Sequence, residues 1–144
     1  MIENDTVKLL RECDAGIKMG IWSIDDVLDL VSEEDFKEKL IECKDEHEKL
    51  KDEVADLLSE YHDDGKEPNP MAKGMSWVKT NVKMSLNYSD KTIADLMIDG
   101  CDMGVKSLSK YLNQYAAADE NSKDIAKRLI GLEEQLSKDM RQFL

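Results

Sequence analysis

Apolar residues recur at alternating steps of three and four along most of this chain, and this period constrains the fold more than any other feature. The first stripe covers residues 7–31 and is interrupted by Asp14, and the second covers 36–61 and is interrupted by His47. This spacing predicts amphipathic helices that each bury one face. Two prolines and seven glycines in 144 residues leave little turn material for an all-β fold.

Cap residues divide the chain into five predicted helices. Side chains that accept a hydrogen bond from free N–H groups favour helix starts, and glycine favours helix ends. The N-cap candidates are Asn4 or Asp5, Ser32, Asn69 before Pro70, and Ser89, and the C-terminal candidate is Gly65. A short helix is expected after Pro70, with Met71, Met75, Val78 and Val82 on one face. A long helix over about 90–118, a turn at 119–122 and a last helix complete the chain.

The chain also contains an internal repeat. ECDAGIK at 12–18 resembles GCDMGVK at 100–106, and KLI at 39–41 resembles RLI at 128–130 in the same order. Two matches in one order favour duplication of a helical hairpin. A single hairpin leaves its apolar stripe exposed, so two hairpins are expected to pack together.

The expected architecture is one all-α domain spanning 1–144. Its first hairpin covers about 4–62, its second about 90–144, and a long crossover over 63–89 holds the short helix. Two hairpins joined in this way predict a four-helix bundle with one long crossover.

The order of motifs resembles a bacterial family of uncharacterised ferritin-like proteins. The motifs are an acidic-x-Gly pattern, an acidic-x-His pattern, a Trp after a Pro-containing linker, and a second acidic-x-Gly pattern. Here they are Asp14-Ala15-Gly16, Asp45-Glu46-His47, Trp77 and Asp102-Met103-Gly104. The resemblance covers essentially the whole chain. It implies a ferritin-like fold, and it implies no assigned activity.

The di-metal motif of ferritin-like proteins is degenerate in this sequence. A di-iron centre needs a Glu on each of two helices and a Glu-x-x-His on each of the other two. His47 follows Lys44 at that spacing, and Glu133 is followed by Leu136. The second half of the chain has no histidine, so a standard ferroxidase centre is not expected.

Four residues remain as candidates for a reduced metal site in the interior: Asp14, Cys43, His47 and Asp102. Cysteine, histidine and carboxylate ligands together would suit Zn²⁺, and Fe is a second candidate. The sequence favours a simpler interpretation without a cofactor, in which Asp14, His47 and Asp102 form a structural polar cluster, because buried charge needs a partner.

Smaller features are interpreted as packing. Cys13 and Cys101 occupy equivalent repeat positions and are expected to pack alike near the bundle axis. Gly16 and Gly104 suggest a close helix approach, or, for Gly104, room for a bulky neighbour such as Trp22 or Trp77. The methionines are interpreted as core filler.

Composition limits the partners. The net charge of −12 disfavours binding to nucleic acid and to anionic membranes. The N-terminal residues lack a signal-peptide pattern, and three cysteines without a CxxC motif favour a reducing cytoplasm.

No catalytic motif stands out, so the sequence favours a non-enzymatic cytoplasmic protein that acts through its surface or its oligomer. Two alternatives stay open: a divergent metal-binding or redox protein, and an acidic module that binds a basic protein. An exposed Trp22 or Trp77 patch could mediate homodimerisation, or either ring could instead belong to the core. An unknown protein partner is a separate expectation.

Overall fold

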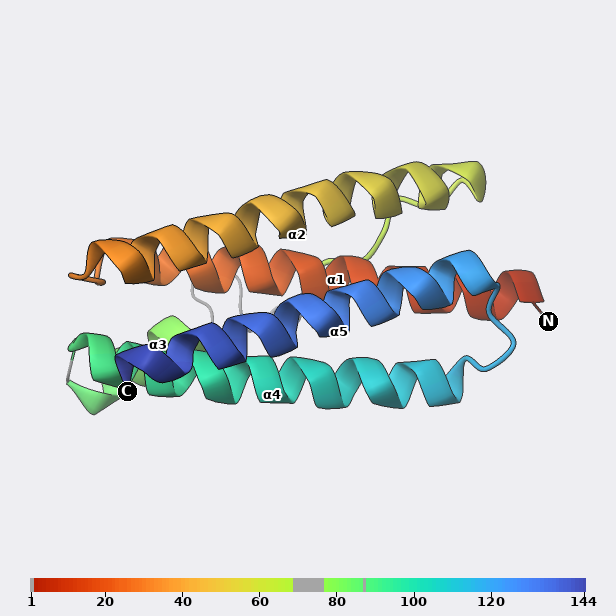
Figure 1. Ribbon diagram of the computed structural model, residues 1–144. Helices are drawn as coiled ribbons and strands as arrows, with labels where there is room; N and C mark the ends of the chain where they lie inside the picture. The colour runs from red at the N-terminus through yellow and green to blue at the C-terminus, as the bar shows by residue number, and fades with distance from the viewer. Residues whose placement is uncertain (1, 69–76, 87) are drawn as a thin grey trace.

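All regular structure in the described part of the chain is helical, as Figure 1 shows. The computed structural model describes residues 2–68, 77–86 and 88–144, and for Ile2 and Trp77 the backbone only. The helices are α1 (Ile2–Leu28), α2 (Glu34–Glu60), α3 (Trp77–Ser85), α4 (Asp90–Gln114), α5 (Glu120–Met140) and the 3₁₀ helix η2 (Arg141–Phe143). The all-α prediction is confirmed. The expected helix start at Asn69-Pro70 and its residues Met71 and Met75 lie outside the described residues.

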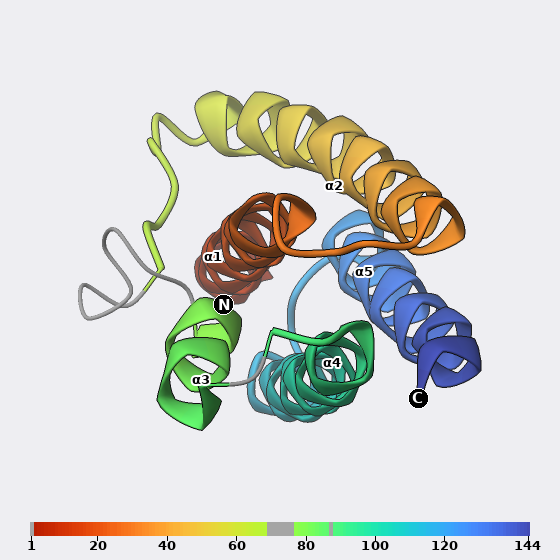
Figure 2. The same ribbon diagram turned by 90° about the vertical axis from the view of Figure 1, so that its left-hand side faces the viewer.

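Two helical hairpins make up most of the molecule. α1 packs along α2, and α4 packs along α5 (Figure 1). In the end view of Figure 2, α5 lies between α2 and α4, and α3 lies beside α1 and α4. The start of α1 and the end of α5 lie at opposite ends of the bundle (Figure 1).

The interior consists of two apolar clusters, one towards each end of the long helices. One is built around the stacked rings of Phe36 and Phe143, whose centroids are 4.5 Å apart. All four long helices pass from one cluster to the other at a similar level. The transitions lie between Ile21 and Ile24, between Cys43 and Leu50, between Cys101 and Leu108, and between Leu129 and Leu136.

The predicted stripes account for this core. Most of their apolar members are buried, and the exceptions are half-buried residues such as Leu57 and Val105. Burial of stripe residues on facing helices is the main favourable term for such a fold, at about 25 cal/mol per Å² of apolar surface.

Two predicted N-caps are wrong. α1 begins at Ile2, before Asn4 and Asp5, and the Asp5 carboxylate instead accepts a hydrogen bond from the Ala117 N–H. Ser32 is also not a cap, because α2 begins at Glu34. The sequence pattern around Asp5 and Ser32 does not reveal their actual hydrogen bonds, since the partners, Ala117 and Asp90, belong to the other hairpin.

The N-terminus of α2 is held by a residue of α4. The N–H groups of Ser32 and Glu33 both donate to the Asp90 carboxylate, at 2.9 Å each. Ser89, by contrast, caps α4 as predicted, since its hydroxyl accepts a hydrogen bond from the Thr92 N–H. One junction thus fixes the starts of two helices from different hairpins.

α2 ends at a position that the sequence did not indicate. Gly65 was the expected C-terminal residue, but His62 takes the left-handed conformation, with φ of 57°. The Asp63 and His62 N–H groups then donate to the Leu58 and Ser59 carbonyls, which is a Schellman motif. Gly65 has φ of 92° further along, where its N–H donates to Asp63.

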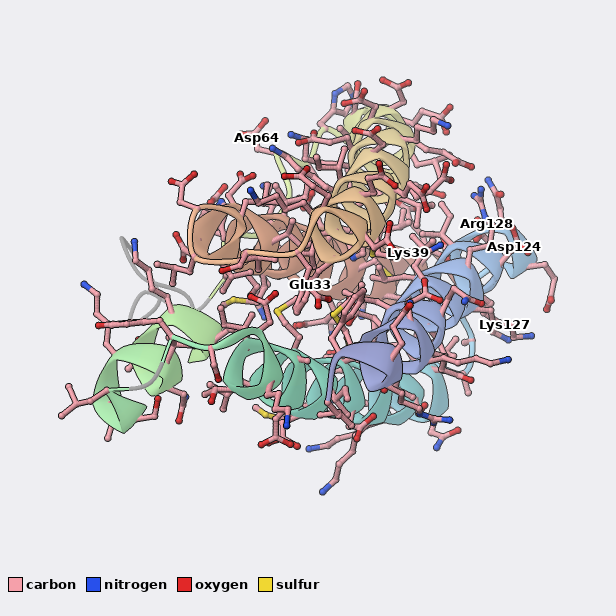
Figure 3. The ribbon with its side chains drawn as sticks, turned by 60° about the vertical axis from the view of Figure 1, so that its left-hand side comes forward. Glu33, Lys39, Asp64, Asp124, Lys127 and Arg128 are labelled. Carbon is pink, nitrogen blue, oxygen red and sulfur yellow. The ribbon has the colours of Figure 1, made fainter. Side chains whose placement is uncertain are left out.

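Charged side chains cover the outer faces of the helices (Figure 3). Arg128 of α5, for example, pairs with Glu53 of α2 at 2.6 Å and with Asp124 at 3.2 Å. Pairs exposed to this degree contribute roughly 0–1 kcal/mol each. No helix within the described ranges is long and apolar enough to span a lipid bilayer.

The Asp90 contact predicts a measurable loss of stability. Asp90→Ala removes the acceptor for two N–H groups, so we expect the free energy of unfolding to fall by about 1 kcal/mol in urea titrations. Asp95→Ala, at an exposed position of the same helix, should change it by less than about 0.5 kcal/mol. Equal effects of the two changes would show that Asp90 does not hold the α2 terminus.

Candidate functional site

A histidine and a glutamate meet in the interior, between the two apolar clusters. His47 of α2 is fully buried, and its Nε2 lies 3.1 Å from Oε1 of Glu133 on α5. Its Nδ1 lies 2.8 Å from the Cys43 carbonyl oxygen and 3.5 Å from the Cys43 sulfur. Both ring nitrogens therefore have partners within the protein.

The geometry fixes one proton on the His47 ring, the one on Nδ1. A carbonyl oxygen can only accept, so Nδ1 must carry a proton that it donates to Cys43. If Glu133 is ionised, Nε2 must also carry a proton, and the ring is then an imidazolium. One proton is thus shared between Nε2 and the carboxylate.

The pKa of His47 follows from two opposing effects. Burial lowers the pKa, but hydrogen bonds to Cys43 and Glu133 outweigh burial and raise it from 6.5 to about 10. The ring is therefore protonated at neutral pH, and the contact with Glu133 is an ion pair. The Glu133 side chain is only 12% exposed, so solvent screens this pair weakly.

Cys101 of α4 joins the same cluster. Burial raises the pKa of its thiol, and the neighbouring Glu133 carboxylate, which also hydrogen-bonds the thiol, raises it further. The thiol therefore stays protonated at neutral pH. Cys43, His47, Glu133 and Cys101 form one connected chain of contacts across three helices.

A glycine on α1 makes room for the His47 ring. A Cβ at Gly20 would lie 2.8 Å from Nε2 and 2.9 Å from Cδ2 of His47, which is closer than real Cβ contacts come. The ring cannot move away, because both of its nitrogens are engaged. Gly20 is thus required by the buried ring, although glycine is an unfavourable residue within a helix.

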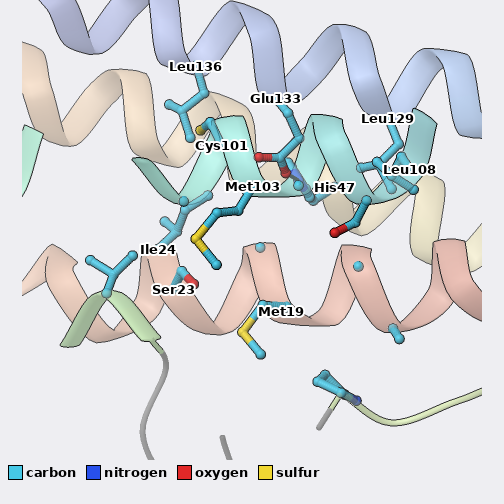
Figure 4. Close-up of a pocket in the computed structure, with 18 of the residues that line it drawn as sticks. Met19, Ser23, Ile24, His47, Cys101, Met103, Leu108, Leu129, Glu133 and Leu136 are labelled. Carbon is cyan, nitrogen blue, oxygen red and sulfur yellow. Dashed lines mark hydrogen bonds and ion pairs between the residues drawn. The ribbon is translucent and has the colours of Figure 1, made fainter. Parts of the chain in front are cut away.

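A pocket of about 460 Å³ lies between α1 and α4, and the Glu133–His47 pair is part of its lining. Figure 4 shows Met19 of α1 and Met103 of α4 at its sides, with Leu129 and Leu136 of α5 beside Glu133. Small residues on both helices leave this space open: Ala15, Gly16, Gly20 and Ser23 on α1, and Gly100, Gly104 and Ser107 on α4.

Of the four residues predicted for a reduced metal site, Cys43 and His47 do lie in contact. Asp14 is buried but has other partners: its Oδ2 lies 2.8 Å from Lys18 Nζ and accepts a hydrogen bond from the Lys66 N–H. Gly20 contacts His47, and Asp14 lies roughly 9 Å from Gly20 along the axis of α1. It anchors the chain that follows α2.

Asp102 is exposed, so its predicted place in the interior is wrong. Its neighbour Cys101 is buried instead, because successive residues on a helix point about 100° apart and only one of them can face the core. The predicted Asp14–His47–Asp102 polar cluster is therefore wrong as well. In the described part of the chain, no three His, Cys, Asp or Glu residues are arranged to hold a metal ion.

The repeat positions behave alike only in part. Cys13 and Cys101 are both buried, as predicted, and burial raises the pKa of the Cys13 thiol to about 12. The glycines differ from expectation. A Cβ at Gly16 would meet Leu129 and one at Gly104 would meet the Glu133 carboxylate, each at ordinary contact distance, so both line the pocket rather than a tight helix contact.

Glu133 is the functional candidate that the sequence pattern concealed. The last helix has an apolar stripe through Leu129, Leu132 and Leu136, and Glu133 also lies on this face, four residues after Leu129. The indication in the sequence is that a carboxylate stands at an apolar stripe position, where it can pair with the histidine expected in the interior.

Gly20 generates a paired prediction. Gly20→Ala should lower the free energy of unfolding by about 1–3 kcal/mol in denaturant titrations, because the new methyl group overpacks His47. Gly131→Ala, which meets nothing within 4 Å, should instead raise it by up to about 1 kcal/mol through helix propensity. A stabilising Gly20→Ala change would contradict the placement of the ring.

The His47–Glu133 pair predicts a specific pH dependence of stability. Because the folded-state pKa of His47 lies above its ordinary value of 6.5, its contribution is fully present below pH 6.5 and is lost as the pH rises through about 10. Glu133→Gln should remove much of this contribution. The difference in free energy of unfolding between wild type and variant should therefore shrink by about 1–2 kcal/mol as the pH rises from 6.5 to about 10.

Urea titrations at pH 6, 8 and 10 measure this difference. Glu134→Gln, an exposed neighbour, serves as the control and should leave the wild-type profile unchanged. Parallel profiles for wild type and Glu133→Gln would rule out the raised pKa.

The site thus combines a buried imidazolium–carboxylate pair with a pocket between two helices. No family model, curated protein or solved structure matches the chain.

Proposed function

We propose that this protein is a non-catalytic, ferritin-like four-helix bundle that binds a small, largely apolar molecule between α1 and α4. Two antiparallel hairpins and an intervening segment with the short helix α3 support the fold proposal. The pocket of about 460 Å³ carries the functional proposal, since ligand pockets typically measure 300–1,000 Å³ and have apolar walls with few polar groups.

The chemistry of the lining supports binding rather than catalysis. A nucleophilic cysteine needs an accessible thiolate. Burial and the Glu133 carboxylate both raise the pKa of Cys101, which disfavours that form. Both nitrogens of His47 already have protein partners, so the ring is poorly placed to exchange protons with a substrate.

The other functions expected from the sequence remain predictions. Action through the surface or an oligomer, and binding of a basic partner, draw on the acidic exterior. Among residues named for dimerisation, Trp22 is half-buried, and the Trp77 side chain lies outside the described residues. For a divergent metal site, Cys43 and Glu133 contact different nitrogens of His47, so a single ion could take the place of only one of these contacts.

Methyl NMR of the methionines tests the binding proposal. We expect 4-phenylbutanol to shift the Met19 methyl signal saturably, because Met19 lies at the side of the pocket (Figure 4). Gly104→Leu should abolish the shift, since its side chain extends from a backbone position beside Glu133 into the pocket.

Gly131→Leu is the matched control, because its Cβ meets no atom within 4 Å and it lies outside the pocket lining. This variant should keep the wild-type response. A Met19 signal that does not respond, or that responds equally in Gly104→Leu, would overturn the proposal.

A further inference from the structure

The Glu133 carboxylate is a polar group of the pocket lining whose hydrogen-bonding capacity is only partly used. Oε1 accepts from His47 Nε2. Oε2 lies on the Gly104 side, 3.5 Å from where a Cβ on that pocket-lining residue would stand. The Cys101 thiol is a further hydrogen-bond partner, and thiols are weak donors. A carboxylate offers about four acceptor sites, so Glu133 can accept from a ligand.

The second carboxylate of the lining is already occupied. Glu12 pairs with Lys66, and it also hydrogen-bonds Tyr111, whose pKa is raised chiefly by burial. Glu133 therefore differs from Glu12 in having a carboxylate oxygen, Oε2, that can accept from a ligand.

The charges in the lining distinguish between ligand classes. Glu12 and Glu133 are the acidic residues of the described lining, and His47 is its basic residue. A ligand carboxylate would place a second negative charge against Glu133 and be repelled. A ligand ammonium group could instead form a charge-assisted hydrogen bond with Oε2, the oxygen that does not accept from the His47 imidazolium, and such a bond is stronger than a neutral one.

The walls describe the rest of the ligand. Ile24, Leu129 and Leu136 are buried apolar residues of the lining, and Met19 and Met103 add flexible thioether side chains (Figure 4). Such walls favour an apolar body and disfavour a second charged group, which would lose its hydration without gaining a partner.

We infer that the ligand is a small apolar amine, whose ammonium group is bound by the Glu133 carboxylate and whose body fills the space between α1 and α4. This inference rests on the proposed function and narrows it to one ligand class. The acidic surface of the protein adds long-range attraction for such a cation.

Three probes with one body and different head groups test this inference: 4-phenylbutylamine, 4-phenylbutanol and 5-phenylpentanoate. Affinities come from the Met19 methyl shift. In wild type the amine should bind at least about tenfold more tightly than the carboxylate. Glu133→Gln should remove most of that preference, and the exposed neighbour change Glu134→Gln should leave it intact.

A measurement on the wild type alone covers the case in which Glu133→Gln does not fold. Attraction to exposed charge is screened at about 0.5 M salt, whereas a contact with a carboxylate that is 12% exposed is screened much less. The preference for the amine should therefore persist at that salt concentration.

The remaining outcomes separate this inference from the proposed function. If the alcohol binds and the amine is no tighter than the carboxylate, the amine inference fails and the pocket proposal stands. If none of the three probes moves the Met19 signal, both fail. A preference that disappears in salt, or persists in Glu133→Gln, identifies surface attraction and overturns the inference.

Discussion

The hydrogen bond between His47 and Glu133 links the two hairpins at the level where the apolar core divides. A buried aromatic ring and a carboxylate at this level exclude apolar packing between them. The facing backbone positions must then be small, and Gly20 is, because a methyl group there would overlap the ring. The polar contact thus lies where the two apolar clusters meet, and both of its residues line the pocket.

Such a contact specifies the fold more than it stabilises it. A buried ion pair gains little over apolar residues of the same shape, but removing one partner costs about 3–5 kcal/mol. Sliding α2 along α5 by one turn, about 5.4 Å, would separate His47 from Glu133 and leave both without a partner. Apolar contacts are non-directional and resist such a slide less strongly. We infer that the pair fixes the register between the hairpins.

The sequence was sufficient for the helices and insufficient for the contacts between them. Stripe positions such as Ile17, Leu40 and Leu129 could be predicted because a helix buries one face whatever its partner is. Cys101 was predicted near the bundle axis, and its neighbour Asp102, about 100° further round the helix, cannot face the core as well. The position of Glu133 was harder to predict, since Leu132 offers an equally regular stripe.

Packing explains Gly20, but it does not explain Gly104, another of the glycines that line the pocket. Gly20 has to be glycine beside His47, but a Cβ at Gly104 would stand 3.5 Å from Glu133 Oε2, an ordinary contact. Glycine within a helix costs about 1 kcal/mol relative to alanine, so stability alone favours alanine at Gly104. That methyl group would lie against the carboxylate on its pocket side. The proposed contact between a ligand and Glu133 would account for glycine at this position.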